Sequence, residues 1–159
     1  MSGFFAVGIA HGKTSENIGT LWRSAYAFGA AVLFTVGARY KKQSSDTPRT
    51  DCKIPLLHFT DIDDLVAHLP AACPLIGVEM ADQAKDLWAY IHLPRAAYLL
   101  GGEDCGLSAR EQARCHGLIQ IDSRVCLNVA TAGSIVMFHR AMQLRPQCGS
   151  LRGNRTCSI

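Results

Sequence analysis

The chain has 159 residues, of which 48% are hydrophobic and 18% charged, and its formal net charge is +3. This balance is typical of one compact globular domain, and it excludes a chain that is disordered throughout or a uniformly basic nucleic-acid coat protein. The apolar runs are far shorter than the ~20 residues needed to cross a membrane. The seven cysteines never form a Cys-x-x-Cys pair, so we expect neither a disulfide framework nor a zinc ribbon, and a reducing cytoplasm is favoured.

Short apolar runs alternate with amphipathic segments of helix length. In chain order, the pattern predicts a strand at 4–9, a helix at 16–28 closed by Gly29, a strand at 31–36, a helix at 61–69 capped by Thr60, a strand at 75–78, a short helix at 83–90, a strand at 96–100, a short helix at 106–115, a strand at 117–121 and a long helix at 125–144. Alternation of this kind predicts an α/β fold, with a mostly parallel sheet and helices on both faces. We expect one domain over residues 1–144 and a basic, flexible tail over 145–159.

Positive charge is concentrated in two parts of the chain. Residues 124–159 contain five arginines and neither Asp nor Glu. The polar stretch 37–55 has no periodicity and is long for a structureless loop, which makes it a candidate functional loop. Its basic side chains, which could bind an RNA backbone, are Arg39, Lys41, Lys42 and Arg49. A solvated loop without a binding role is the alternative.

The predicted strand ends are the places to search for chemistry, because ligands of such sheets bind beyond the carboxyl ends of the strands. Gly101 and Gly102 directly follow one predicted strand, and Gly106 allows the turn into the next helix. The spacing is not that of the Gly-x-Gly-x-x-Gly dinucleotide fingerprint, and no Gly-Lys-Ser or Gly-Lys-Thr of a phosphate loop is present. Taken alone, this turn is more often simple geometry than a binding site.

Polar residues near two predicted helix starts are further candidates. Arg23 follows Asn17 by six residues, and its guanidinium could grip a phosphate or polarise a hydroxyl. Asn128 begins a helix of small and apolar residues, where a buried amide must find hydrogen-bond partners. The alternatives are that Asn17 caps its helix, that Arg23 lies on a solvated face, and that Asn128 caps a core helix.

Together and in this order, the three segments resemble the SpoU (TrmH-like) branch of the SPOUT RNA methyltransferases. The matching residues are Asn17, Gly19 and Arg23 in the first segment, Gly101, Glu103, Gly106 and Leu107 in the second, and Leu127, Asn128, Val129 and Ala132 in the third. Two positions depart from the family pattern. Asp122 follows Ile121 where proline is common, and Cys126 precedes Leu127 where serine is common.

The resemblance implies a C-terminal trefoil knot, a pocket for S-adenosylmethionine, and a homodimer whose active site lies near the subunit interface. The cofactor contacts implied by position are Val78, Gly101, Ile121, Cys126 and Leu127. The implied reaction is methyl transfer to a ribose 2′-hydroxyl of tRNA or rRNA, in which Arg23 would lower the pKa of the hydroxyl. Asn17, Glu103 and Asn128 would orient Arg23 and the pocket loops. No metal is implied, and the six histidines show no ligand spacing.

Two other interpretations stay open at this point. One is a SpoU-like protein that holds RNA or cofactor without transferring methyl groups. The other is an unrelated α/β enzyme whose Gly-Gly turn meets the phosphate of a nucleotide. Preference for a nucleotide over S-adenosylmethionine would identify the latter, and RNA binding without methyl transfer would identify the former.

Overall fold

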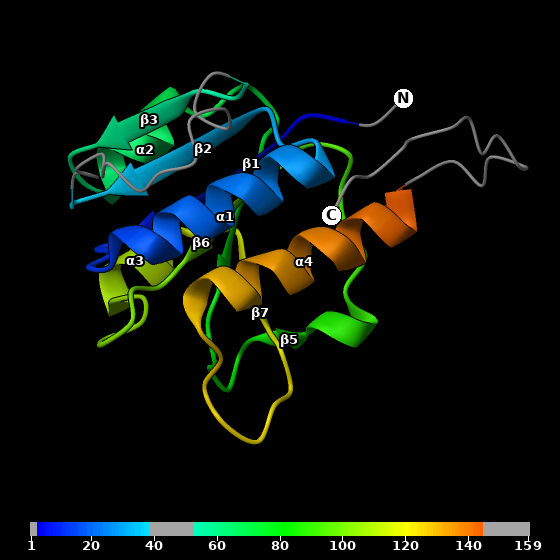
Figure 1. Ribbon diagram of the computed structural model, residues 1–159. Coiled ribbons are helices and arrows are strands. Elements are labelled where there is room, and N and C mark those ends of the chain that lie inside the picture. Colours follow the sequence, from blue (N-terminus) through cyan, green and yellow to red (C-terminus); the bar gives the residue numbers. More distant parts are fainter. Residues whose placement is uncertain (1–2, 39–52, 145–159) are drawn as a thin grey trace, which may run out of the picture.

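The computed structural model describes residues 3–38 and 53–144, which share one seven-stranded sheet of order β3-β2-β1-β6-β4-β7-β5 (Figure 1). Every strand pairing in the described part is parallel. The strands are β1 (Phe5–Ala10), β2 (Val32–Val36), β3 (Leu56–Phe59), β4 (Leu75–Val78), β5 (Lys85–Asp86), β6 (Ala96–Leu100) and β7 (Gly117–Gln120). The predicted α/β fold with a mostly parallel sheet is confirmed. The trefoil knot stays a prediction.

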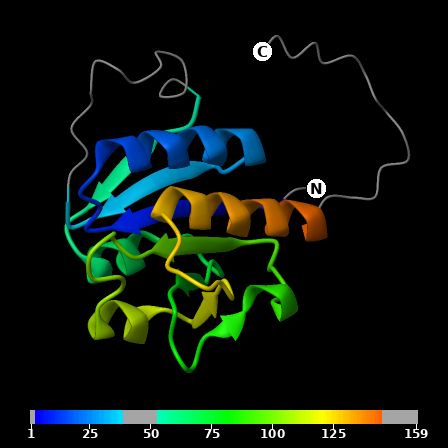
Figure 2. The ribbon, with the colours of Figure 1, turned by 60° about the horizontal axis from the view of Figure 1, so that its bottom comes forward.

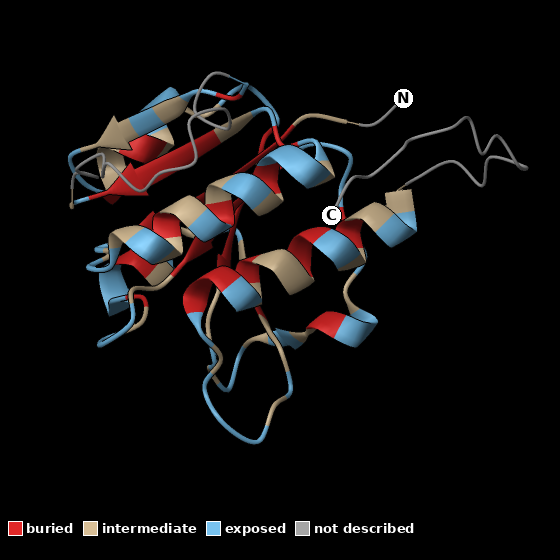
Figure 3. Ribbon diagram, in the orientation of Figure 1, coloured by how far each residue is buried: buried red, intermediate tan, exposed pale blue. Residues whose placement is uncertain are grey.

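The neighbouring strands β1 and β6, in the middle of the sheet, are buried along their whole length (Figure 3). Their sequences are continuous apolar runs because helices cover both faces of the sheet. Alternate residues of β1 therefore enter different cores. Val7 and Ile9 pack with one helical layer, whereas Ala6 and Ala10 pack with the other.

Four α-helices form the two covering layers in the described chain. They are α1 (Ser15–Phe28), α2 (Ile62–His68), α3 (Ala109–Arg114) and α4 (Val129–Leu144). The helices α1 and α4 run side by side in both views (Figure 1, Figure 2), and their buried residues share one core with Val7 and Tyr98. The buried residues of α2 belong to the second core. None of the described helices is long and apolar enough to cross a membrane.

Several predicted helix starts move because side chains cap them elsewhere. In α2 the cap is Asp61 and not Thr60, since the Asp61 side chain accepts hydrogen bonds from the N–H groups of Asp63 and Asp64. The helix α3 begins three residues later than predicted, after a capping box between Ser108 and Glu111. The helix α4 begins at Val129 and not at residue 125, so that residues 122–128 form a loop.

The predicted helix at 83–90 is wrong. Residues Lys85–Asp86 form the edge strand β5, which pairs with β7, and a single 3-10 turn follows at Leu87–Ala89. The side chain of Asp86 accepts the N–H of Trp88 and so caps this turn. The strand β3 was not predicted at all, because it is a short edge strand whose residues are only partly buried.

Candidate functional site

A cavity of about 490 Å³ opens beyond the carboxyl ends of β4, β6 and β7. Its volume lies within the usual range for small-molecule sites. The walls are the end of β4, the turn after β6, the loop after β7 and the first turn of α4. The sequence-predicted cofactor contacts all line it, namely Val78, Gly101, Ile121, Cys126 and Leu127. Segments up to 54 residues apart, from Val78 to Ala132, therefore meet here because β6, β4 and β7 are neighbours in the sheet.

The cavity wall has an apolar part and an acidic part. Its apolar side chains include Val78, Leu100, Ile121, Leu127 and Val129. Its charged side chains are Glu79, Glu103 and Asp104, and no Lys, Arg or His of the described residues lines it. Asp122, which departs from the family pattern, is not part of the lining either. This wall suits a ligand that has a flat apolar group, hydrogen-bonding groups and a positive charge.

A chain of side-chain hydrogen bonds crosses the edge of the cavity. Asn128 Nδ2 donates to Asn17 Oδ1 at 2.8 Å, and Asn17 Nδ2 donates to Glu103 Oε1 at 2.6 Å. Asn128 Oδ1 also accepts the N–H groups of Ala130 and Thr131, so Asn128 caps α4 as well. The structure thus joins three of the four sequence-predicted catalytic residues. Asn17 does not cap α1, because its amide is used between the two loops.

The carboxylate of Glu103 is held in its ionised form. Burial acts to raise the pKa of Glu103, but hydrogen bonds from the Asn17 side chain and from backbone N–H groups outweigh it, and the pKa lies below its ordinary value. One of these bonds comes from the Lys13 N–H at 3.2 Å. The ammonium group of Lys13 forms an ion pair with Asp104, and this contact raises the pKa of Lys13. Sequence reasoning gave no role to Lys13 or Asp104.

Arg23 lies apart from this chain of hydrogen bonds. It is an exposed residue of α1, and six residues of helix place it about 9 Å along the axis from Asn17. It is not among the residues that line the cavity. The structure therefore does not bring Arg23 to the cavity of its own chain.

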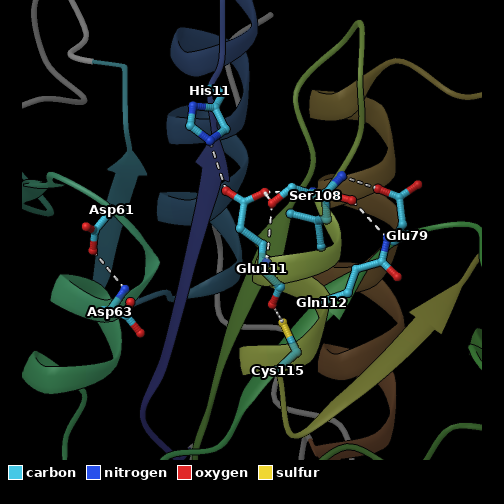
Figure 4. Close-up of polar contacts among 9 residues, drawn as sticks. His11, Asp61, Asp63, Glu79, Ser108, Glu111, Gln112 and Cys115 are labelled. Carbon is cyan, nitrogen blue, oxygen red and sulfur yellow. Dashed lines mark hydrogen bonds and ion pairs between the residues drawn. The ribbon is translucent and has the colours of Figure 1, made fainter.

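The four sequence-predicted RNA contacts, Arg39, Lys41, Lys42 and Arg49, lie outside the described residues. The described end of β2 shows where this segment leaves the sheet. Gly37 has a φ of +78° and packs against the ring of His11, whose Nε2 lies 3.0 Å from the buried Glu111 Oε1 (Figure 4). The segment thus starts at the same edge of the sheet as the cavity.

Polar contacts also fix the turn that joins β6 to α3 (Figure 4). Glu79 Oε2 accepts the N–H of Leu107 at 2.6 Å, and Gln112 Nε2 donates to the Leu107 carbonyl at 2.8 Å. The signal that could have singled out Glu79 is its place directly after β4, although the residue type alone gave no role. The turn is thereby tied to both β4 and α3.

The fold and this site define an α/β protein with a cavity of small-molecule size at the carboxyl edge of a parallel sheet. The chain belongs to the SpoU rRNA Methylase family, whose model matches residues 5–138. A comparison with curated protein sequences gave no significant match.

Solved structures share the fold at low sequence identity. An AdoMet-bound rRNA methyltransferase from Sinorhizobium meliloti aligns with a TM-score of 0.79 and 23% identity, over 92% of this chain and 59% of that one. A structure concerned with 2-OH methylation of C/U34 on tRNA aligns with a TM-score of 0.79 and 18% identity, over 91% of this chain and 98% of that one. The A. aeolicus TrmH/SpoU tRNA modifying enzyme aligns with a TM-score of 0.78 and 15% identity, over 87% of this chain and 74% of that one. This chain spans about 59% of the length of the S. meliloti enzyme.

Proposed function

We propose that this protein is an S-adenosylmethionine-dependent RNA methyltransferase that acts on a ribose 2′-hydroxyl of tRNA or rRNA. The observation that carries the proposal is the hydrogen-bonded chain Asn128, Asn17 and Glu103 at the edge of the cavity. Family membership supports it, as do the relatives that bind AdoMet or concern 2-OH methylation of tRNA. We place the reaction in the cytoplasm, where the free thiols of Cys105 and Cys126 would stay reduced.

The cavity wall fits S-adenosylmethionine. Val78, Ile121 and Leu127 would pack around the adenine, and the backbone of Gly101 allows close approach to the turn. The acidic part of the wall suits the net positive charge of the molecule. When bound, S-adenosylmethionine supplies an electrophilic methyl group.

The protein's own task is to position the hydroxyl and to assist the loss of its proton. The ionised Glu103 orients the Asn17 amide, and Asn17 in turn orients Asn128, so both loops and α4 are held in one arrangement. The guanidinium of Arg23 would lower the pKa of the ribose hydroxyl by its charge. It is a poor base, so an RNA phosphate or a water molecule would take the proton.

We propose a homodimer, because Arg23 lies away from its own cavity and a second copy would bring it to the partner's cavity. The outer sides of α1 and α4 carry exposed apolar side chains that a second copy would cover. Tyr26, Phe138 and Met142 are 42%, 55% and 66% exposed. Exposed apolar patches of this kind mark interaction surfaces.

Calorimetric titration with S-adenosylmethionine and S-adenosylhomocysteine tests the proposal, followed by transfer of labelled methyl groups to tRNA and rRNA pools. Saturable binding near one molecule per subunit and 2′-O-methylated nucleotides in the digested RNA are expected. Binding of cofactor and RNA without transfer would instead favour the catalytically silent alternative, which the unusual Cys126 motivates. Binding by the Cys126→Ser variant alone would locate the defect at that residue. Failure of both proteins to bind would refute the methyltransferase proposal.

A further inference from the structure

Glu79, at the end of β4, joins three of the four segments that build the cavity. Its N–H donates to the Ile119 carbonyl of β7 at 3.0 Å, and its Oε2 accepts the N–H of Leu107 in the turn after β6 at 2.6 Å. Its Oε1 accepts the N–H of Met80 at 3.1 Å. The carboxylate is half-buried and lies on the cavity wall, beside the turn drawn in Figure 4.

The turn is shaped to bring its backbone against this carboxylate. Gly106 has a φ of +61°, a conformation that favours glycine. A Cβ at Gly106 would also overlap Glu79 Oε2, so a larger residue would displace the carboxylate. The position of the negative charge is therefore fixed by the backbone and not only by a side-chain rotamer.

The charge of Glu79 is not neutralised within the described residues. Asp104, on the same wall, forms an ion pair with Lys13. The Glu103 carboxylate accepts hydrogen bonds from the Asn17 side chain and from the Lys13 N–H. No ion pair of Glu79 occurs in the described part of the chain, and no basic side chain there lines the cavity. A carboxylate in a partly enclosed cavity favours a ligand with a positive charge over a neutral one of the same shape.

We propose that Glu79 makes the pocket selective for the cationic methyl donor over its demethylated product. This inference rests on the proposed function. S-adenosylmethionine carries a sulfonium, an ammonium and a carboxylate, and hence a net charge of +1. S-adenosylhomocysteine has lost the sulfonium charge and is neutral overall. The fixed carboxylate stabilises the first more than the second, which also favours release of the product after transfer.

Calorimetric titration at fixed ionic strength tests this with S-adenosylmethionine, S-adenosylhomocysteine and sinefungin, in which an amine gives the charge in place of the sulfonium. The Glu79→Gln variant should bind the two cationic ligands on the order of tenfold more weakly and the neutral one nearly as well. The matched control is Asp82→Asn, which removes an exposed carboxylate three residues after Glu79 that does not line the cavity. The control should keep the preference of the wild type.

Equal weakening of all three ligands in Glu79→Gln would mean that Glu79 only anchors the turn, and it would overturn the inference while leaving the proposed function intact. If the variant fails to fold, the same titrations are repeated with the wild type at increasing salt concentration. Its preference for the cationic ligands should shrink as salt rises. A preference that does not depend on salt overturns the inference. If the wild type binds none of the three ligands, the proposed function itself is refuted.

Discussion

At the scale of single residues, the Asn17 amide is the junction of the site. It accepts from Asn128 and donates to Glu103, and only a side chain with both a donor and an acceptor can do so. Because the two partners lie on different loops of the cavity, a change at Asn17 alters the position of both.

Replacing Asn17 with Asp should lower methyl transfer on the order of 100-fold. The new carboxylate would lie against Glu103 Oε1, now 2.6 Å from Asn17 Nδ2, and the two loops would separate. The measurement is kcat/KM with labelled S-adenosylmethionine, alongside the melting temperature. Glu16→Gln, an exposed change in the same helical turn, should stay within about twofold of the wild type. Wild-type activity of the Asp variant would show that this hydrogen bond has no part in catalysis.

A second residue-scale prediction concerns His92, which is 2% exposed. Its Nδ1 lies 2.6 Å from the Tyr98 hydroxyl and its Nε2 lies 3.0 Å from His139 Nδ1. Burial, and then the nearby His139 and Arg140, lower the pKa of His92 to about 4. The unfolded chain, with an ordinary pKa near 6.5, binds the proton first as pH falls.

Stability contributed by neutral His92 should therefore be present above pH 6.5 and lost as pH falls towards 4, by roughly 3 kcal/mol in all. Urea unfolding at pH values between 7.5 and 4.5 measures it. His92→Gln should show a shallower decline over this window. Parallel curves for the two proteins would count against a buried neutral imidazole.

At the scale of elements, the helices and strands that could be predicted from the sequence are those whose apolar pattern is set by burial in the core. The strands β1 and β6 and the helices α1 and α4 were predicted because their apolar periodicity is set by burial. The edge strand β5 and the partly buried β3 were missed, since pairing with a neighbour and not hydrophobic pattern fixes them. For the site, strand ends and motifs placed the cavity, but no pattern predicts which side chains join across 111 residues, as Asn17 and Asn128 do.

The contact between α1 and α4 gives an element-scale prediction. Gly133 of α4 packs against the fully buried Leu21 of α1, and a Cβ at Gly133 would overlap the Leu21 methyl group. Gly133→Val should lower the free energy of unfolding by about 2 kcal/mol through overpacking. Chemical denaturation measures it. A Cβ at Gly117 would meet nothing within 4 Å, so Gly117→Ala should change stability far less. Similar losses in both variants would argue against close packing at Gly133.

At the scale of the whole molecule, several large apolar side chains are exposed on the surface of the described chain. Phe138 is more than half exposed although it packs edge-on against Phe28, and Met142 lies one turn further along α4. Trp88 and Ile91, which follow the edge strand β5, are 69% and 80% exposed. A second copy of the chain that covers α1 and α4 would remove part of this surface from water.

Sedimentation velocity should give twice the 17.2 kDa mass of the chain for the wild type and the single mass for Phe138→Asp. The variant should also lose methyl transfer, because Arg23 would no longer reach a partner's cavity. Leu57→Asp introduces the same charge at an exposed apolar position of the edge strand β3 and should remain dimeric. A monomeric wild type at micromolar concentration would exclude the proposed dimer.

The hydrogen-bonded chain through Asn17 has a consequence for synthesis of the protein. Asn17 lies in α1, and its partner Asn128, at the start of α4, is synthesised 111 residues later. A nascent chain that ends before residue 128 holds an unfinished cavity edge, however well its first strands have paired. Contacts of such wide sequence separation form late in folding. The newly made protein therefore gains its complete site only after the start of α4 has been synthesised.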